Sequence, residues 1–163
     1  MKKFNFIIIC TLGFLFVPSS LAQVSAGIRY SSYDFGEGVF DDPAVIELAF
    51  GYRFKITNDF KATPEFVYGR GVSNIDSVFG KIKIEDYISL RARLKYDLTE
   101  TIGIFYLPSL GKLDRSPFVG EDDWQFSHGV GIEYQITDNL STDLSYESID
   151  NIGTWSIGLR KLF

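Results

Sequence analysis

The stretch YISLRARLKY, residues 87–96, decides the fold class of this chain. Successive side chains of a β-strand point to opposite faces of the sheet, so odd and even positions can be sorted directly. All even positions are apolar or aromatic, whereas Arg91, Arg93 and Lys95 occupy odd positions together with Tyr87 and Ser89. The alternation predicts a strand with one apolar face and one charged face.

The same alternation recurs in seven further segments, at 24–31, 46–56, 60–69, 102–108, 125–136, 140–147 and 155–163. It is weakest at 102–108, where both faces are apolar, and its parity reverses in the last segment. A soluble sandwich would not place glycine, serine and charges in its core, so we expect the bulky face to contact lipid. Because lipid tolerates no open sheet edge, the sequence predicts an all-β fold: a closed eight-stranded antiparallel up-and-down transmembrane β-barrel.

An internal repeat marks three tight turns. FKITNDF, YDLTETI and YQITDNL begin at Phe54, Tyr96 and Tyr134, and each carries a threonine at its fourth position. The repeat predicts three short turns at one end of the barrel. The longer connections then lie at the other end, at about 32–43, 70–85 and 109–123, with a short one near 149–153. Short periplasmic turns and longer external loops are typical of such barrels.

Strand-end aromatic residues are expected to form girdles at the two membrane interfaces. These residues are Tyr30, Tyr52, Phe54, Tyr96, Tyr134 and Trp155.

The first 22 residues have the pattern of a signal peptide. Lys2 and Lys3 precede the apolar run FNFIIICTLGFLFV, and small residues then lead to Ala22. The run is too short to cross a bilayer as a helix, so we expect a cleaved signal at 1–22 and a barrel domain at 23–163. A lipoprotein signal at Cys10 is disfavoured because Ile9 is bulky where a small residue is expected.

Cleavage after Ala22 removes the only cysteine and two lysines. The chain has a net charge of −5, so the remaining 141 residues carry −7. A cysteine-free chain cannot be stabilised by disulfides. The acidic balance argues against nucleic acid as a partner and against polybasic attachment to lipid.

Two stretches resemble a known family, the small porin-like, OmpA-type barrels of Gram-negative outer membranes. GVGIEYQITDNLSTDLSYESID, residues 129–150, resembles the penultimate hairpin of that family, and WSIGLRKLF, residues 155–163, resembles its terminal strand. The resemblance implies Sec-type export, integral outer-membrane location, and recognition of Phe163 by the barrel-assembly machinery. It also implies contact with outer-membrane lipids and lipopolysaccharide, and a monomer. Lys161 departs from the family, which usually has an aromatic or apolar residue there.

The face opposite the apolar one collects charges of both signs. They are Arg29, Glu47, Arg53, Lys61, Glu65, Arg91, Arg93, Lys95, Glu133, Asp143, Glu147 and Arg160. An eight-stranded barrel has an interior just wide enough for side chains, and buried charges must pair. We therefore expect a plug of ion pairs and water. The alternative is a narrow ion path along the stripe formed by Arg91, Arg93 and Lys95.

His128, the only histidine, raises the possibility of a lipid-modifying enzyme. A nucleophile and its base must lie within hydrogen-bond reach. Neighbouring strand residues point to opposite faces, so His128 faces lipid while Ser127 and Glu133 face inward. We assign no catalytic residue and expect no enzyme.

The expected loops contain acidic residues, Asp34, Glu37, Asp41 and Asp42 in the first and Asp114, Glu121, Asp122 and Asp123 in the third. Their spacing matches no defined cation loop, so no metal site and no cofactor are assigned. Pro64 removes one ladder hydrogen bond, and we expect a bulge or a water molecule there.

The sequence favours a structural or interaction role in the envelope, with a low-conductance channel as the alternative and a lipid-modifying enzyme as a less favoured one.

Overall fold

A computed structural model describes residues 22–34, 42–77, 80–116, 124–149 and 152–163. Residues 1–21 of the proposed signal segment 1–22 lie outside this range, as do the acidic residues Glu37, Asp41, Glu121, Asp122 and Asp123. The described chain forms ten strands: β1 (Ala22–Asp34), β2 (Ala44–Lys55), β3 (Phe60–Gly71), β4 (Asn74–Ser77), β5 (Gly80–Asp97), β6 (Ile102–Tyr106), β7 (Ser109–Ser116), β8 (Gln125–Thr137), β9 (Leu140–Ile149) and β10 (Ile152–Leu162).

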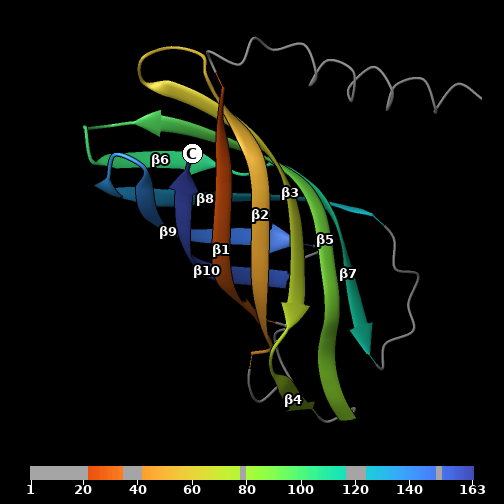
Figure 1. Ribbon diagram of the computed structural model, residues 1–163. Helices are drawn as coiled ribbons and strands as arrows, with labels where there is room; N and C mark the ends of the chain where they lie inside the picture. Colours follow the sequence, from red (N-terminus) through yellow and green to blue (C-terminus); the bar gives the residue numbers. More distant parts are fainter. Residues whose placement is uncertain (1–21, 35–41, 78–79, 117–123, 150–151) are drawn as a thin grey trace, which may run out of the picture.

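These strands form one closed antiparallel sheet (Figure 1). β1 pairs with β2 on one side and with β10 on the other, which closes the ring. From Tyr87 onward, β5 keeps one register against both β6 and β7, and β8 keeps one register against both, so β6 and β7 together are one barrel strand. The β5–β7 ladder shifts register between Ile84 and Tyr87. β4 pairs only with β5, as a hairpin beyond the ring. The predicted eight-stranded closed barrel is confirmed.

Pro108 divides the barrel strand between β6 and β7. Leu107 N still donates to Gly129 O at 2.8 Å, and Pro108 O accepts from Ala92 N at 3.0 Å. Proline lacks the N–H that the ladder needs, so the strand is interrupted in hydrogen bonding but not in direction. The sequence pattern at 102–108 did not predict this break.

The repeated turns have a shared geometry. In the first, the N–H groups of Ile56 and Thr57 donate to Phe60 O, and Thr57 Oγ1 accepts from Phe60 N at 3.0 Å. The second makes the same contacts one repeat further on, with Thr99 Oγ1 accepting from Ile102 N at 2.9 Å. The threonine hydroxyl therefore fixes the turn by accepting a backbone hydrogen bond.

The third turn is tighter. Thr137 pairs directly with Leu140 across a two-residue connection, after a register shift between Gln135 and Thr137. Thr137 Oγ1 donates to Asn139 Oδ1 at 3.1 Å instead of accepting from the backbone. All three predicted short turns are present at one end, which we call the turn end; the opposite end is the loop end.

The strands extend beyond the predicted lengths at the loop end. β5 has 18 residues, and its first part pairs with β4 inside the segment expected as the loop 70–85. β7 runs to Ser116 inside the expected loop 109–123. These parts project past the other strands in Figure 1. The loop boundaries were wrong because alternation is required only where the sheet faces lipid, whereas backbone pairing continues beyond it.

Pro64 produces no register shift in the ladder, so the bulge expected there is absent. The β2–β3 ladder keeps one register from Gly51↔Glu65 to Phe54↔Ala62 but omits the two pairs between them. Pairing of β3 with β5 continues through Pro64↔Ala92. A Cβ at Gly51 would collide with Pro64 O, so glycine lets the two backbones approach where the ladder hydrogen bond is missing.

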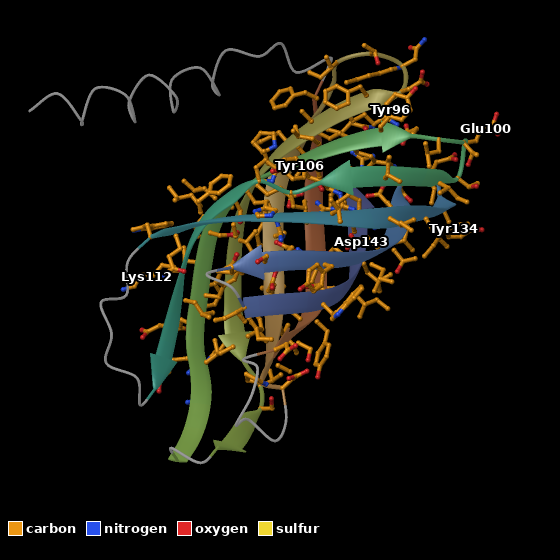
Figure 2. The ribbon with its side chains drawn as sticks, turned by 180° about the vertical axis from the view of Figure 1, so that it is seen from behind. Tyr96, Glu100, Tyr106, Lys112, Tyr134 and Asp143 are labelled. Carbon is orange, nitrogen blue, oxygen red and sulfur yellow. The ribbon has the colours of Figure 1, made fainter. Side chains whose placement is uncertain are left out.

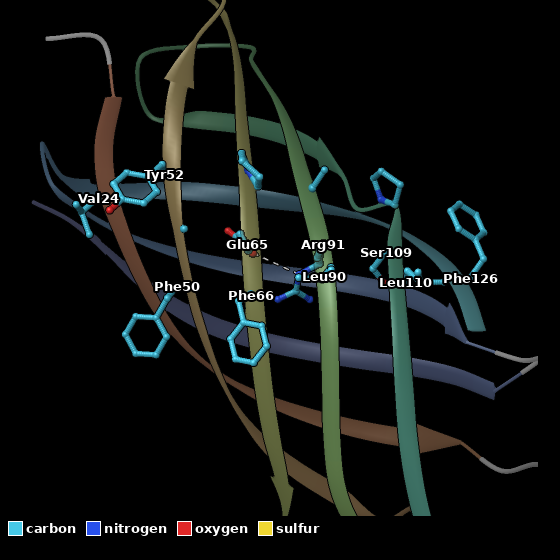
Figure 3. A pocket seen from close by; sticks show the side chains of 14 residues that line it. Val24, Phe50, Tyr52, Glu65, Phe66, Leu90, Arg91, Ser109, Leu110 and Phe126 are labelled. Carbon is cyan, nitrogen blue, oxygen red and sulfur yellow. Dashed lines mark hydrogen bonds and ion pairs between the residues drawn. The ribbon is translucent and has the colours of Figure 1, made fainter. Parts of the chain in front are cut away.

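Pro64, Ala92 and Pro108 also form the floor of a hollow of about 700 Å³ on the outer face of the barrel (Figure 3). Large exposed side chains surround the floor: Val24, Phe50, Tyr52, Phe66, Leu90, Leu110 and Phe126. Glu65 and Arg91 pair with each other on the other side of the sheet, at 3.3 Å. The hollow is therefore an apolar feature of the membrane face.

Outward side chains are apolar or aromatic along the barrel. Leu90, Val130 and Ile157 are each more than half exposed. The expected girdle residues Tyr30 and Trp155 lie outward toward the loop end, and Trp155 stacks at a tilt on Tyr146 with ring centroids 5.0 Å apart. Tyr96 and Tyr134 lie toward the turn end near Glu100 (Figure 2).

Candidate functional site: a charged lumen closed at the loop end

The charged residues predicted to face inward all lie inside the barrel. Each of the following is at most 7% exposed: Arg29, Glu47, Arg53, Glu65, Arg91, Arg93, Lys95, Glu133, Asp143, Glu147 and Arg160. They come from seven of the eight barrel strands, and strand alternation aims each of them at the axis.

Glu133 is the centre of the network in the turn-end half. Its carboxylate accepts from Arg93 Nη2 at 2.8 Å and from Lys95 Nζ at 2.5 Å. Arg53 Nη2 lies 3.7 Å from the same carboxylate. One fully buried carboxylate therefore pairs with three cations from two strands, β2 and β5.

Arg29 and Arg91 form a second centre nearer the loop end. Arg29 Nη2 lies 2.6 Å from Glu147 Oε1, and Arg91 Nη1 lies 3.3 Å from the same oxygen. Both guanidinium groups also approach Glu47 Oε2, at 3.7 and 3.8 Å. Two arginines thus share two carboxylates across the lumen.

The two centres are joined. Asp143 bridges Arg93, at 3.2 Å, and Arg29, at 3.9 Å. Glu65 joins Arg91, at 3.3 Å, to Arg160, at 2.5 Å. All eleven residues therefore belong to one continuous network of ion pairs.

The network reaches the turn end through a pair that is less buried. Lys95 Nζ lies 3.0 Å from Asp97 Oδ1, and Asp97 also forms an ion pair with Lys61. Lys61 was expected among the inward charges, but Asp97 was not. The sequence did contain a signal for Asp97, because this residue occupies the next odd position after Lys95 in the same strand.

Small inward residues make room for these long side chains. A Cβ at Gly158 would lie 2.7 Å from Arg29 Cγ, and one at Gly131 would collide with the Phe105 ring. Phe105 in turn lies under Arg93, whose guanidinium carbon is 3.5 Å from the ring centroid. Such a cation–π contact stabilises a desolvated arginine. It explains why an aromatic residue, Phe105, occupies an inward position in the segment 102–108.

An apolar cluster closes the loop end of the lumen. Its buried members are Tyr33, Val45, Ala49, Val67, Ile84, Tyr87, Ile149 and Ile152, with Leu113 packed against them. The rings of Tyr33 and Tyr87 meet edge to face at 6.5 Å, and Tyr33 OH donates to Glu47 Oε1 at 3.4 Å. We call these nine residues the loop-end cap. It rests directly on the ion-pair network.

Sequence reasoning missed the loop-end cap. Tyr33, Ile84 and Ile152 lie in segments that were expected to be loops, so their orientation was not considered. Val67 and Tyr87 were assigned inward, but as exceptions in a polar face. The available signal was apolar residues at inward positions near the loop ends of several strands.

Ion pairs occupy the part of the lumen in which the sequence analysis placed the alternative of a narrow ion path. Arg91, Arg93 and Lys95 each contact at least one carboxylate, and none is more than 5% exposed. Inward hydroxyl groups also bond within the lumen, since Ser31 Oγ donates to Glu47 and Ser109 bonds to Ser127.

His128 is exposed on the outer face, while Ser127 is buried inside. A different serine lies beside His128, because Ser148 of β9 pairs directly with it on the outward side of the sheet. Reasoning along one strand could not find this residue. Within the described residues no hydrogen bond joins the two side chains, so they do not form the contact that a nucleophile and its base require.

The terminal strand pairs to its end. Leu162 N donates to Asn139 O at 2.8 Å and Phe163 N to Val24 O at 2.9 Å. The Phe163 ring is 68% exposed, and Lys161 lies outward beside it. In the described part of the chain no His, Cys, Asp and Glu residues group in a way that could hold a metal ion. Nor do these ranges contain a helix long and apolar enough to cross a membrane.

Comparisons with known proteins agree with this architecture. Residues 11–158 match the family model described as outer membrane protein beta-barrel domain. No protein with a curated description matches the sequence.

Solved structures share the fold. Ail, the attachment invasion locus protein of Yersinia pestis, is 22% identical with a TM-score of 0.57, over 87% of this chain and 97% of that one. The N-terminal barrel domain of Pseudomonas aeruginosa OprF is 15% identical with a TM-score of 0.57, over 87% and 99%. A transmembrane β-barrel designed de novo is 7% identical with a TM-score of 0.54, over 86% and 95%. With the family match over most of its length and a closed barrel that is apolar outside, this chain belongs to the outer membrane protein beta-barrel domain family and resides in the outer membrane.

Proposed function

We propose that this protein is a non-enzymatic structural or interaction barrel, which anchors in the outer membrane, contacts lipopolysaccharide and presents its loop end to the exterior. The observation that carries the proposal is the interior, where one ion-pair network fills the lumen and the loop-end cap lies over it. A barrel filled in this way has no wide path for solutes.

The loop end offers groups suited to anionic lipid. Arg70 is exposed on the outward side of β3, next to Tyr68. Lys83 and Lys112 lie on β5 and β7 at the same end, and Lys112 is separated along the barrel from the turn residue Glu100 (Figure 2). In the proposed orientation the short turns face the periplasm, so these cations lie on the side of the barrel that faces the exterior. There they would meet the phosphates of lipopolysaccharide.

The proposal also covers how the protein is exported and assembled. The segment 1–22 directs export and is removed after Ala22, so β1 of the mature protein begins at Gln23, one residue after the start of the described strand. The terminal strand ending at Phe163 then serves as the recognition signal for the barrel-assembly machinery. Within the closed ring no described strand has an open edge for a second copy, which supports a monomer.

Conductance in planar bilayers tests the proposal against the channel alternative. The purified folded barrel is expected to give no stable unitary current. A steady current that changes when Arg91→Gln and Arg93→Gln are introduced would establish an ion path through the lumen instead.

Lipid chemistry in cells tests the enzyme alternative. The lipid A pattern is expected to be identical in cells with the wild-type protein, His128→Ala or no protein. A modification lost in both the His128→Ala and deletion strains would contradict the non-enzymatic role.

A further inference from the structure

Lys161 is an outward-facing cation close to the turn end. It lies directly opposite Ala26 on β1 and Leu140 on β9, and it is exposed. Its neighbour Arg160 points the other way, into the lumen, where Nη1 donates to Ser25 Oγ at 2.7 Å.

A groove begins at Lys161 and runs over the first two strands. It encloses about 290 Å³ and is lined on β1 by Ala26, Gly27 and Ile28. Leu48 and Phe50 on β2 and Leu159 on β10 form its walls. The groove exists because Ala26 is small and pairs with two much larger residues, Phe50 and Lys161. β10, β1 and β2 lie side by side in Figure 1.

No carboxylate among the described residues forms an ion pair with the ammonium group of Lys161. Its Nζ lies 5.1 Å from the centroid of the Phe163 ring, and within the described ranges Lys161 forms no ion pair. A lysine on the lipid face is tolerated only near an interface, where its stem follows apolar surface and its amine reaches polar groups. The group best suited to that amine is an anion supplied by the membrane itself.

We propose that Lys161 and this groove bind an anionic glycerophospholipid of the inner leaflet, with the phosphate at Lys161 Nζ and one acyl chain along Ala26. Charge complementarity selects the headgroup, and the apolar walls hold the chain. The choice of leaflet rests on the proposed function, in which the turn end faces the periplasm.

Lipid retention tests the proposal. The barrel is placed in nanodiscs of equal phosphatidylglycerol and phosphatidylcholine and released into mild detergent, and the retained lipids are counted by native mass spectrometry. The wild-type protein is expected to enrich phosphatidylglycerol. Lys161→Gln should lower that enrichment roughly fivefold, because one surface lysine contributes about that factor for anionic lipid. Lys161→Arg should keep it.

Lys55→Gln is the matched control, because Lys55 is exposed at the same end but does not line the groove. It should leave the enrichment unchanged. Ala26→Leu fills the groove and should reduce retention of both lipids. Equal enrichment in the wild type and Lys161→Gln, or an equal loss in Lys55→Gln, would overturn the proposal.

A second experiment tests the proposed orientation separately from the lipid site. A cysteine replacing Glu100, in the exposed turn between β5 and β6, should resist an impermeant reagent in intact cells. Labelling there would overturn both the proposed orientation and the leaflet. A protected Glu100 site with no headgroup preference would overturn the lipid site alone.

Discussion

The two halves of the lumen are filled by opposite means. The loop-end cap is apolar, with Ile84, Tyr87 and Val67 packed together without exposure. The turn-end half is ionic, with Glu133 holding Arg93 and Lys95. Both fillings lie inside the same ring of strands, behind the same apolar outer surface.

The difference shows what each filling requires. An apolar cap needs only volume and shape, so each residue contributes through packing. A buried ion pair must recover the desolvation of two charges, and removing one partner leaves the other unpaired. The network should therefore be the more fragile half toward single substitutions, although its net contribution to stability is smaller than its contacts suggest.

The largest effect is expected at Glu133. Glu133→Gln keeps the shape but removes the negative charge that Arg53, Arg93 and Lys95 share. Asp143 still contacts Arg93 and Asp97 still contacts Lys95, whereas the pair of Arg53 is lost, so the free energy of unfolding should fall by about 3–5 kcal/mol. Urea unfolding in lipid vesicles, followed by the mobility of unboiled protein on gels, measures the change. Glu100→Gln, at an exposed turn, is the control. Equal losses of stability at the two positions would contradict the assignment of Glu133 as the centre of the ion-pair network in this half.

Truncation in the cap should cost somewhat less. Ile84→Ala leaves a cavity among fully buried neighbours and should lower the free energy of unfolding by about 2–5 kcal/mol in the same assay. Ile88→Ala lies on the same strand but faces outward, where lipid chains refill the space, so its effect should be smaller. Equal losses would mean that the cap is not tightly packed.

Replacing both members of one ion pair tests whether the ionic half of the lumen depends on its charges or only on filling the space. Glu65→Leu removes the carboxylate that pairs with Arg160 and one of the three carboxylates near Arg91, and Arg160→Met removes one of the two cations near Glu65. The double variant replaces the Glu65–Arg160 ion pair with an apolar contact. The double variant should therefore be more stable than the sum of the single effects predicts, with a coupling of about 1–3 kcal/mol. Additive losses would show that the charges themselves stabilise this half.

The smallest effect is expected in the turns. Thr99→Ala removes the acceptor for Ile102 N and should cost about 0.5–1.5 kcal/mol. Thr137→Ala should cost less, because Thr137 Oγ1 bonds a side chain rather than the backbone. Unfolding midpoints of the two variants compare the turns, and a larger loss at Thr137 would contradict the assignment.

Alternation predicted the barrel because the rule is local. In a strand facing lipid, each residue such as Leu90 or Ile132 must be apolar and its neighbour must point inward, so orientation follows from one stretch of sequence. Closure follows from the bilayer, which tolerates no unpaired edge. The reversed parity of the last strand was likewise visible in Trp155 and Ile157.

The remaining features depend on groups distant in sequence. Which carboxylate meets Arg29 depends on the stagger of the strands around the ring, and Glu147 reaches it from 118 residues away. The cap was missed because Tyr33 and Ile152 extend the sheet beyond the lipid-facing region. Pro64 needed no bulge because the partner strand carries Gly51, a compensation that a single-strand pattern does not show.

Single-cysteine labelling tests the arrangement most directly. In a Cys10→Ser background, Ser145→Cys and Ser156→Cys place a small thiol inward, while Leu144→Cys and Ile157→Cys place one outward. A membrane-confined maleimide should label the two outward sites and spare the two inward ones in folded protein. Labelling of Ser145→Cys and Ser156→Cys with protection of Leu144→Cys and Ile157→Cys would contradict an apolar exterior around a charged lumen.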